Sequence, residues 1–84
     1  MRVSVKCFAW AREVTGEEEV SVEIPEGGTV ADLRGRLEER FPVFAGRMES
    51  IAVSVNQEFS GDKARIRPGD EVALIPPISG GRRP

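Results

Sequence analysis

Hydrophobic residues alternate with polar ones at the start of the chain. Val3, Val5 and Cys7 share one parity, and polar residues occupy the positions between them. This period of two predicts a β-strand over residues 1–8 with one buried face. The alternation returns over residues 19–24, so these two strands are expected to pair as an antiparallel hairpin. Cys7 lies on the inward face, which indicates a small core side chain rather than a nucleophile.

A helical period of about 3.6 residues follows the second strand. Thr29 and Asp32 have the spacing of a capping box, which predicts that a helix begins here, and Pro42 ends it. Gly35 lies inside this helix, where glycine costs about 1 kcal/mol relative to alanine, so close packing is expected at that point. The predicted buried stripe consists of Val30, Leu33, Leu37 and Phe41.

The second half of the chain predicts three more strands. Residues 43–50 are irregular, with room for one short helical turn. Residues 51–56 alternate as a third strand, residues 58–59 form a very short fourth strand, and residues 71–75 form the last one after a turn signal at residues 67–70. The fold class is therefore α+β: a mixed sheet in the order β-β-α-β-β-β, with one main helix packed across it.

Two apolar residues break the alternation of their strands. Phe8 has the parity of the polar positions in the first strand, and Ile75 points away from the helix in the last strand. If these strands run side by side in parallel, both residues lie at the same edge and form one apolar patch. Such patches often mark partner sites, and a covering loop is the alternative.

Composition narrows the classes of function. Eighty-four residues form one domain, and 12 basic against 14 acidic residues argue against a nucleic-acid binder. The absence of histidine removes the usual metal ligand and the usual general base, so we expect no bound cofactor, no metal and no enzyme activity of its own. One cysteine, no signal peptide and no apolar run long enough for a membrane predict a cytoplasmic protein.

The last nine residues differ from the rest of the chain. Pro76-Pro77 donates no hydrogen bond to a sheet and predicts a stiff, extended exit from the last strand. Gly80-Gly81 has no Cβ atoms, so another protein can close around its main chain. We therefore expect a folded domain over residues 1–75 and a flexible tail over residues 76–84, suited to a narrow cleft in a partner.

Three stretches resemble the small, sulfur-carrying subunit of molybdopterin synthase, of the MoaD/ThiS-like ubiquitin-like family. They are Phe8–Gly16 (FAWAREVTG), Val53–Gln57 (VSVNQ) and Gly69–Gly81 (GDEVALIPPISGG). Because element order and length also match, the resemblance covers residues 1–81. It implies a ubiquitin-like β-grasp fold for the domain.

The resemblance also implies a chemistry centred on Gly81. A ubiquitin-activating-type enzyme would use ATP to adenylate its carboxylate, which would become a thiocarboxylate. The tail would then enter the large synthase subunit and donate sulfur in molybdenum cofactor synthesis, within a heterotetramer of two large and two small subunits. The residues implied to bind these partners are Phe8, Arg12, Phe59, Ile75, Pro76, Pro77, Ile78, Ser79 and Gly80.

The chain departs from the family pattern after Gly81. Arg82-Arg83-Pro84 follows, so Gly81 has an amide where the chemistry needs a carboxylate. We expect a protease to remove residues 82–84, with a docking paralogue and an incidental tail as alternatives. A sulfur carrier for thiamine, tRNA thiolation or cysteine synthesis remains open, as do a ubiquitin-like protein modifier and a plain interaction module.

Overall fold

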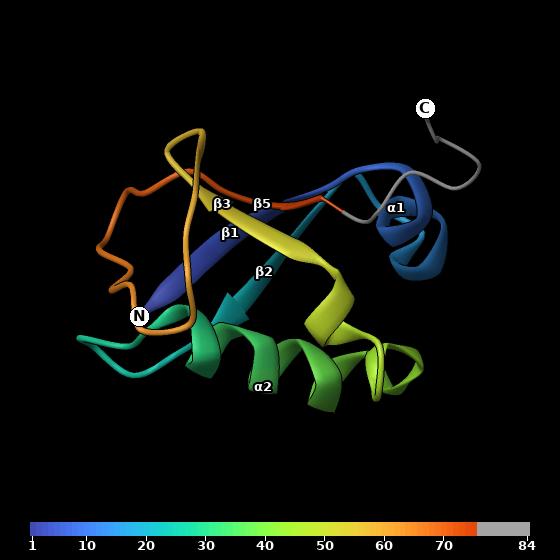
Figure 1. Ribbon diagram of the computed structural model, residues 1–84, viewed down its shortest axis with the longest axis horizontal. Coiled ribbons are helices and arrows are strands. Elements are labelled where there is room, and N and C mark those ends of the chain that lie inside the picture. The colour runs from blue at the N-terminus through green and yellow to red at the C-terminus, as the bar shows by residue number, and fades with distance from the viewer. Residues whose placement is uncertain (76–84) are drawn as a thin grey trace.

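The computed structural model describes residues 1–75, and residues 76–84 lie outside the described part. Strands, two α-helices and two short 3-10 turns build one mixed sheet with a helix across it (Figure 1). No helix in the described part is long and apolar enough to cross a membrane. The elements are β1 (Arg2–Cys7), α1 (Ala9–Thr15), β2 (Glu19–Glu23), α2 (Val30–Arg40), η1 (Pro42–Phe44), η2 (Met48–Ser50), β3 (Ala52–Val55), β4 (Glu58–Phe59) and β5 (Val72–Ile75).

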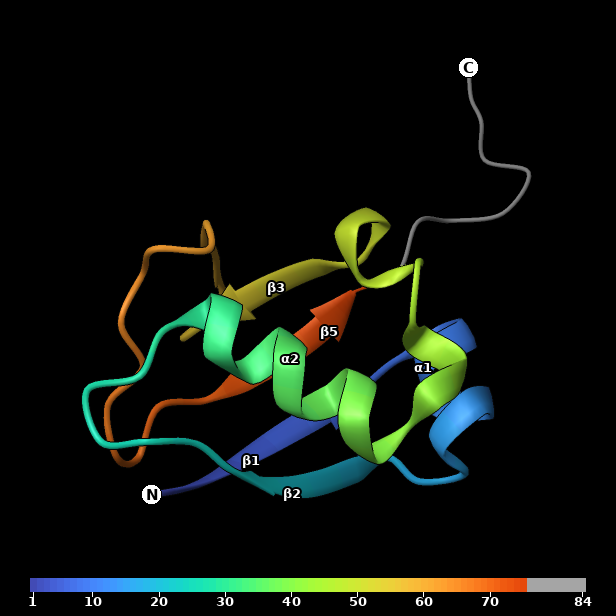
Figure 2. The ribbon, with the colours of Figure 1, turned by 90° about the horizontal axis from the view of Figure 1, so that it is seen from below.

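The sheet has the strand order β2-β1-β5-β3-β4. β1 pairs antiparallel with β2, as the sequence predicted, and parallel with β5, where Val5 lies opposite Val72 and Cys7 opposite Leu74. Since β1 and β5 run in the same direction, their C-terminal ends lie at the same end of the sheet. Figure 2 shows α2 lying across one face of the sheet, with α1 beside the C-terminal ends of β1 and β5.

The predicted inward positions form the core between the sheet and α2. Thr29 begins α2 as expected: its hydroxyl accepts from the Asp32 amide at 3.4 Å, and the Asp32 carboxylate accepts from the Thr29 amide at 2.9 Å. These reciprocal bonds satisfy two amides that the first helical turn leaves without partners. The fully buried residues of the strands and of α2 include Val5, Val30, Leu33, Leu37, Val72 and Leu74.

The connection between β1 and β2 contains a helix that the sequence analysis did not anticipate. α1 begins after Phe8, whose side chain makes no capping hydrogen bond, and it ends at Gly16 with a left-handed φ of 76°. Ala11 is its one buried residue, and Trp10 packs partly against the core. A helix of this length is about two turns, which is too short to display a helical period.

The region predicted as irregular contains two 3-10 turns, where we expected at most one helical turn. Phe44 of η1 and Met48 of η2 are buried. The Phe44 ring meets Trp10 edge-on at 5.7 Å between centroids and Phe41 at 6.0 Å. This aromatic cluster closes the end of the core that lies between α1 and α2.

The close packing expected around Gly35 is wrong, and the space found there leads to a testable prediction. An added Cβ would find no atom within 4 Å, and its φ is not positive. Gly35→Ala should therefore stabilise the protein by about 1 kcal/mol, since alanine loses less backbone entropy on helix formation. The urea midpoint should rise with an unchanged m-value.

Gly28 provides the matched control for this substitution. A Cβ there would lie 2.7 Å from the Pro25 carbonyl oxygen, so Gly28→Ala should lower the urea midpoint. Equal or lower stability of Gly35→Ala would contradict the prediction and would mean that the helix makes a contact at this position.

Candidate docking surface

A hollow of about 300 Å³ lies on the face of the sheet opposite α2. Its two aromatic residues are exposed, Phe8 by 49% and Phe59 by 74%. Large apolar side chains at such exposure are candidates for partner contact. We call this surface the apolar hollow, and it is lined by Phe8, Ser54, Gln57, Phe59, Glu71, Ala73 and Ile75.

The register of three strands brings these residues together. Ile75 of β5 pairs with Ala52 of β3, and Ser54 pairs with both Ala73 and Phe59. Because side chains alternate across a strand, Ser54, Ala73 and Ile75 point to the face opposite the core, where they line the hollow. The parallel pairing of β1 and β5 also places Phe8 beside Ile75 in this hollow, as their parity predicted.

A tight turn positions Phe59. Asn56 and Gln57 have φ values of 54° and 70°, and they join β3 directly to β4. Two consecutive residues with positive φ match the twist of an antiparallel hairpin. The Asn56 side chain further accepts from the Glu71 amide at 2.9 Å, which holds the turn against the start of β5.

Arg12 lies beside the hollow rather than in it. It lines a neighbouring cavity of about 380 Å³ that shares Phe8 as one of its walls. Its guanidinium lies 3.3 Å from the Glu18 carboxylate, and both side chains are exposed. An exposed pair of this kind contributes little to stability, so Arg12 can exchange Glu18 for another carboxylate at low cost.

Cys7 lines the same neighbouring cavity but remains a core residue. Its side chain is buried, as the strand pattern predicted, and burial raises the pKa of the thiol above its usual value. A thiol whose pKa is raised holds its proton at neutral pH and is a poor nucleophile. The residue therefore has a packing role beside the candidate surface.

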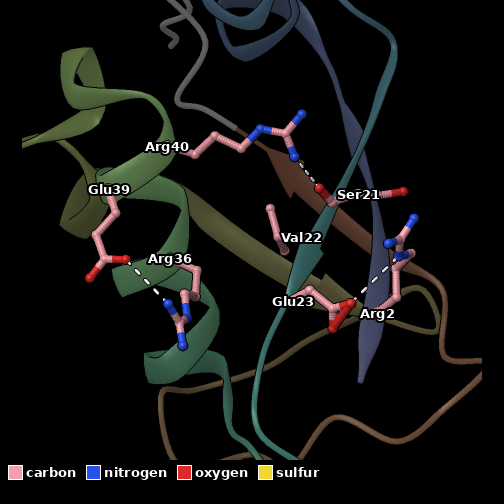
Figure 3. Close-up of a pocket in the computed structure, with 7 residues that line it drawn as sticks. All are labelled: Arg2, Ser21, Val22, Glu23, Arg36, Glu39 and Arg40. Atoms are coloured by element: carbon pink, nitrogen blue, oxygen red, sulfur yellow. Dashed lines mark hydrogen bonds and ion pairs between the residues drawn. The ribbon is translucent and has the colours of Figure 1, made fainter.

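A further cavity, of about 500 Å³, contains none of the predicted site residues. It lies between α2 and the edge strand β2 (Figure 3), and its polar groups already pair with one another. Arg40 donates to the Ser21 carbonyl, and Arg36 lies 3.4 Å from Glu39. The Arg40 contact occupies one main-chain acceptor of the edge strand β2, which discourages pairing with another chain at that point.

The predicted site residues beyond Ile75 lie outside the described residues. Ile75 itself lines the apolar hollow, so the described part of the chain ends at this surface. Sequence analysis missed Ser54, Gln57, Glu71 and Ala73. Strand parity alone would have found Ser54 and Ala73, which alternate with the buried Val53 and Leu74.

Comparison with known proteins agrees with the fold and the sequence motifs. The model of the ThiS family matches residues 5–81. A molybdopterin synthase sulfur carrier subunit of Arabidopsis thaliana is 35% identical over 81 residues, which cover 96% of this chain and 84% of that protein. The protein of the same name from Chlamydomonas reinhardtii is 37% identical over 83 residues, covering 96% of this chain and all of that one.

A solved structure gives the same result for the fold. SAMP1 from Haloferax volcanii is 31% identical, with a TM-score of 0.85, and the match covers 96% of this chain and all of that one. The fold is thus the small α+β, ubiquitin-like β-grasp with a mixed sheet that the sequence predicted. Since the family model spans residues 5–81 and the relatives match over nearly their whole length, the chain belongs to the ThiS family.

Proposed function

We propose that this chain is the sulfur carrier subunit of a molybdopterin synthase. The observation that carries the proposal is its similarity, over 96% of its length, to two relatives of that name. The family match extends to Gly81, so it includes the Gly-Gly pair on which a carrier would depend. The single, reduced core cysteine is consistent with work in the cytoplasm, which we include in the proposal.

Gly81 would carry the sulfur. A carboxylate is a poor electrophile, and attack of its oxygen on the α-phosphorus of ATP, with loss of pyrophosphate, gives it AMP as a leaving group. A hydrosulfide ion then attacks the acyl carbon, AMP leaves, and a thiocarboxylate remains. A ubiquitin-activating-type enzyme would perform these steps, because this chain contributes no histidine and needs only to present its tail.

The apolar hollow would dock both partners of the carrier. Phe8, Phe59 and Ile75 form a compact apolar surface next to the start of the tail, so a partner bound there receives residues 76–81 at its own active site. Arg12 at the margin would pair with a partner carboxylate. The large synthase subunit would bind in a heterotetramer, and the activating enzyme would use the same surface beforehand.

Removal of residues 82–84 belongs to the same proposal. The Gly81 carbonyl is bonded to Arg82 in this sequence, so a protease must release its carboxylate before adenylation. Sulfur delivery to thiamine, to a tRNA base or to cysteine would use the same chemistry with different partners.

A ubiquitin-like modifier is the second candidate function. It is favoured by the similarity to SAMP1, which is also described as small archaeal modifier protein 1. In that case Gly81 would form an amide with a lysine of a target protein.

The intact mass of the protein from its own host separates these functions. A carrier should show a species that ends at Gly81, part of it heavier by the difference between a sulfur and an oxygen atom. A modifier should show conjugates of higher mass that survive denaturant and reductant. A single species that retains Arg82-Arg83-Pro84 while molybdenum cofactor is being made would refute the carrier function.

A further inference from the structure

Ser54 is a buried polar residue in the lining of the apolar hollow. It is 7% exposed, and within the described residues it is the one polar or charged residue that is buried to this degree. Its strand neighbours Ala73 and Phe59 have no polar side-chain atoms, and both line the apolar hollow with it. The Ser54 side chain therefore lies on the floor of the hollow rather than in the core under α2.

The Ser54 hydroxyl has no hydrogen-bond partner among the side chains and main chain of residues 1–75. Ser50 and Ser60 differ: the Ser50 hydroxyl donates to the Arg47 carbonyl at 2.9 Å, and that of Ser60 to the Glu58 carbonyl at 3.2 Å. Most buried hydroxyl groups in proteins are bonded to protein or to water, so the Ser54 hydroxyl depends on water in the open hollow and needs another partner once water is excluded.

Docking would make the binding free energy depend on whether the partner offers a hydrogen-bonding group to the Ser54 hydroxyl. A protein surface closing over Phe59 and Phe8 would exclude water from the floor of the hollow. Ser54 would then be either hydrogen-bonded to the partner or left unbonded in a dry interface, and the second outcome costs about 1–3 kcal/mol. Such a cost discriminates between partners that supply the matching group and those that do not.

The charges around the hollow indicate which group matches. Glu71 lines the hollow, and its carboxylate lies 3.0 Å from the Lys6 ammonium, which neutralises it. Because Glu71 is already paired with Lys6, an anion from a partner would bring an unpaired charge into the hollow, and an uncharged acceptor fits better. A main-chain carbonyl oxygen, which every polypeptide presents, satisfies this condition.

We propose that Ser54 is a specificity-determining residue of the docking surface, and that its hydroxyl donates a hydrogen bond to a main-chain carbonyl oxygen of the large synthase subunit. This inference rests on the proposed function, because it requires that the apolar hollow binds that subunit. It assigns to Ser54 a role beyond the apolar contacts of Phe8, Phe59 and Ile75.

Ser54→Ala tests the proposal through two measurements with opposite expectations. Affinity for the large subunit from the same organism, measured by isothermal titration calorimetry, should fall about tenfold because the carbonyl loses its donor. The urea midpoint of the free chain should stay equal or rise, since no internal hydrogen bond is removed. Unchanged affinity would overturn the proposal, and so would a lower midpoint, which would reveal a partner within the chain.

Ser54→Cys separates the hydrogen bond from the shape of the side chain. Cysteine restores most of the volume but donates only weakly, so its affinity should resemble that of Ser54→Ala. If cysteine restores full affinity, packing rather than hydrogen bonding explains the loss, and the proposal fails. Ser60→Ala is the matched control, because Ser60 does not line the hollow and its removal should leave affinity unchanged.

The same titrations distinguish this proposal from the proposed function. If Phe59→Ala weakens binding and Ser54→Ala does not, the surface docks the large subunit and only the role of Ser54 is wrong. If neither substitution matters, or the subunits do not bind at all, the docking function itself fails.

Discussion

A chain that ends at Gly81 should be converted fully to the thiocarboxylate, whereas one that ends at Gly80 should not be converted at all. The reacting carbon must reach the active site of the activating enzyme, and loss of one residue withdraws it by about 3.5 Å, far more than a reaction tolerates. Incubation with the activating enzyme, ATP and a sulfur donor, followed by intact-mass measurement, gives the converted fraction of each form.

The chain that retains Arg82-Arg83-Pro84 is the decisive third form. Its Gly81 carbonyl is an amide, so we expect no mass gain until a protease has cut after Gly81. All three forms share residues 1–75, so equal circular dichroism and equal urea midpoints control for folding. Conversion of the uncut chain would contradict the need for trimming, and conversion of the form ending at Gly80 would show that Gly81 is not the carrier.

The strands and their faces could be predicted because a period of two leaves few alternatives. Val3, Val5 and Cys7 are buried as their parity requires, and the opposite parity correctly predicted that Phe8 is exposed. The capping pair at Thr29 is also a local signal, since its two hydrogen bonds join residues three apart. At these positions, residues close together in the sequence determine the conformation.

The features that could not be predicted depend on residues distant in the sequence. α1 lacks a side-chain cap and begins at Ala9, whose φ of 51° is rare for alanine and is not recognisable from composition. The parity of Ser54 gives its direction, but its burial results from β4 and β5 on either side. Gly35 suggested close packing against the helix, but whether a neighbour lies close depends on the tertiary structure, which leaves the space around Gly35 empty.

Phe59→Ala should reduce affinity for the large subunit by roughly 30- to 150-fold, the second large effect that we expect. The ring is 74% exposed in the free chain, so docking would bury most of it. Aromatic residues that become buried at the centre of an interface typically contribute about 2–3 kcal/mol. The free chain should keep its stability, because an exposed side chain on an edge strand makes few internal contacts.

Val43→Ala provides the matched control for Phe59→Ala. Val43 is also a large apolar residue, exposed by 52%, but it belongs to η1 and does not line the apolar hollow. Its truncation should leave the affinity unchanged, whereas equal losses for the two variants would mean that exposed apolar area, and not this surface, drives binding. The same pair measured against the activating enzyme extends the test. If Phe59→Ala weakens both complexes, one surface serves both partners, and the carrier must leave the enzyme that loads it before it can enter the synthase.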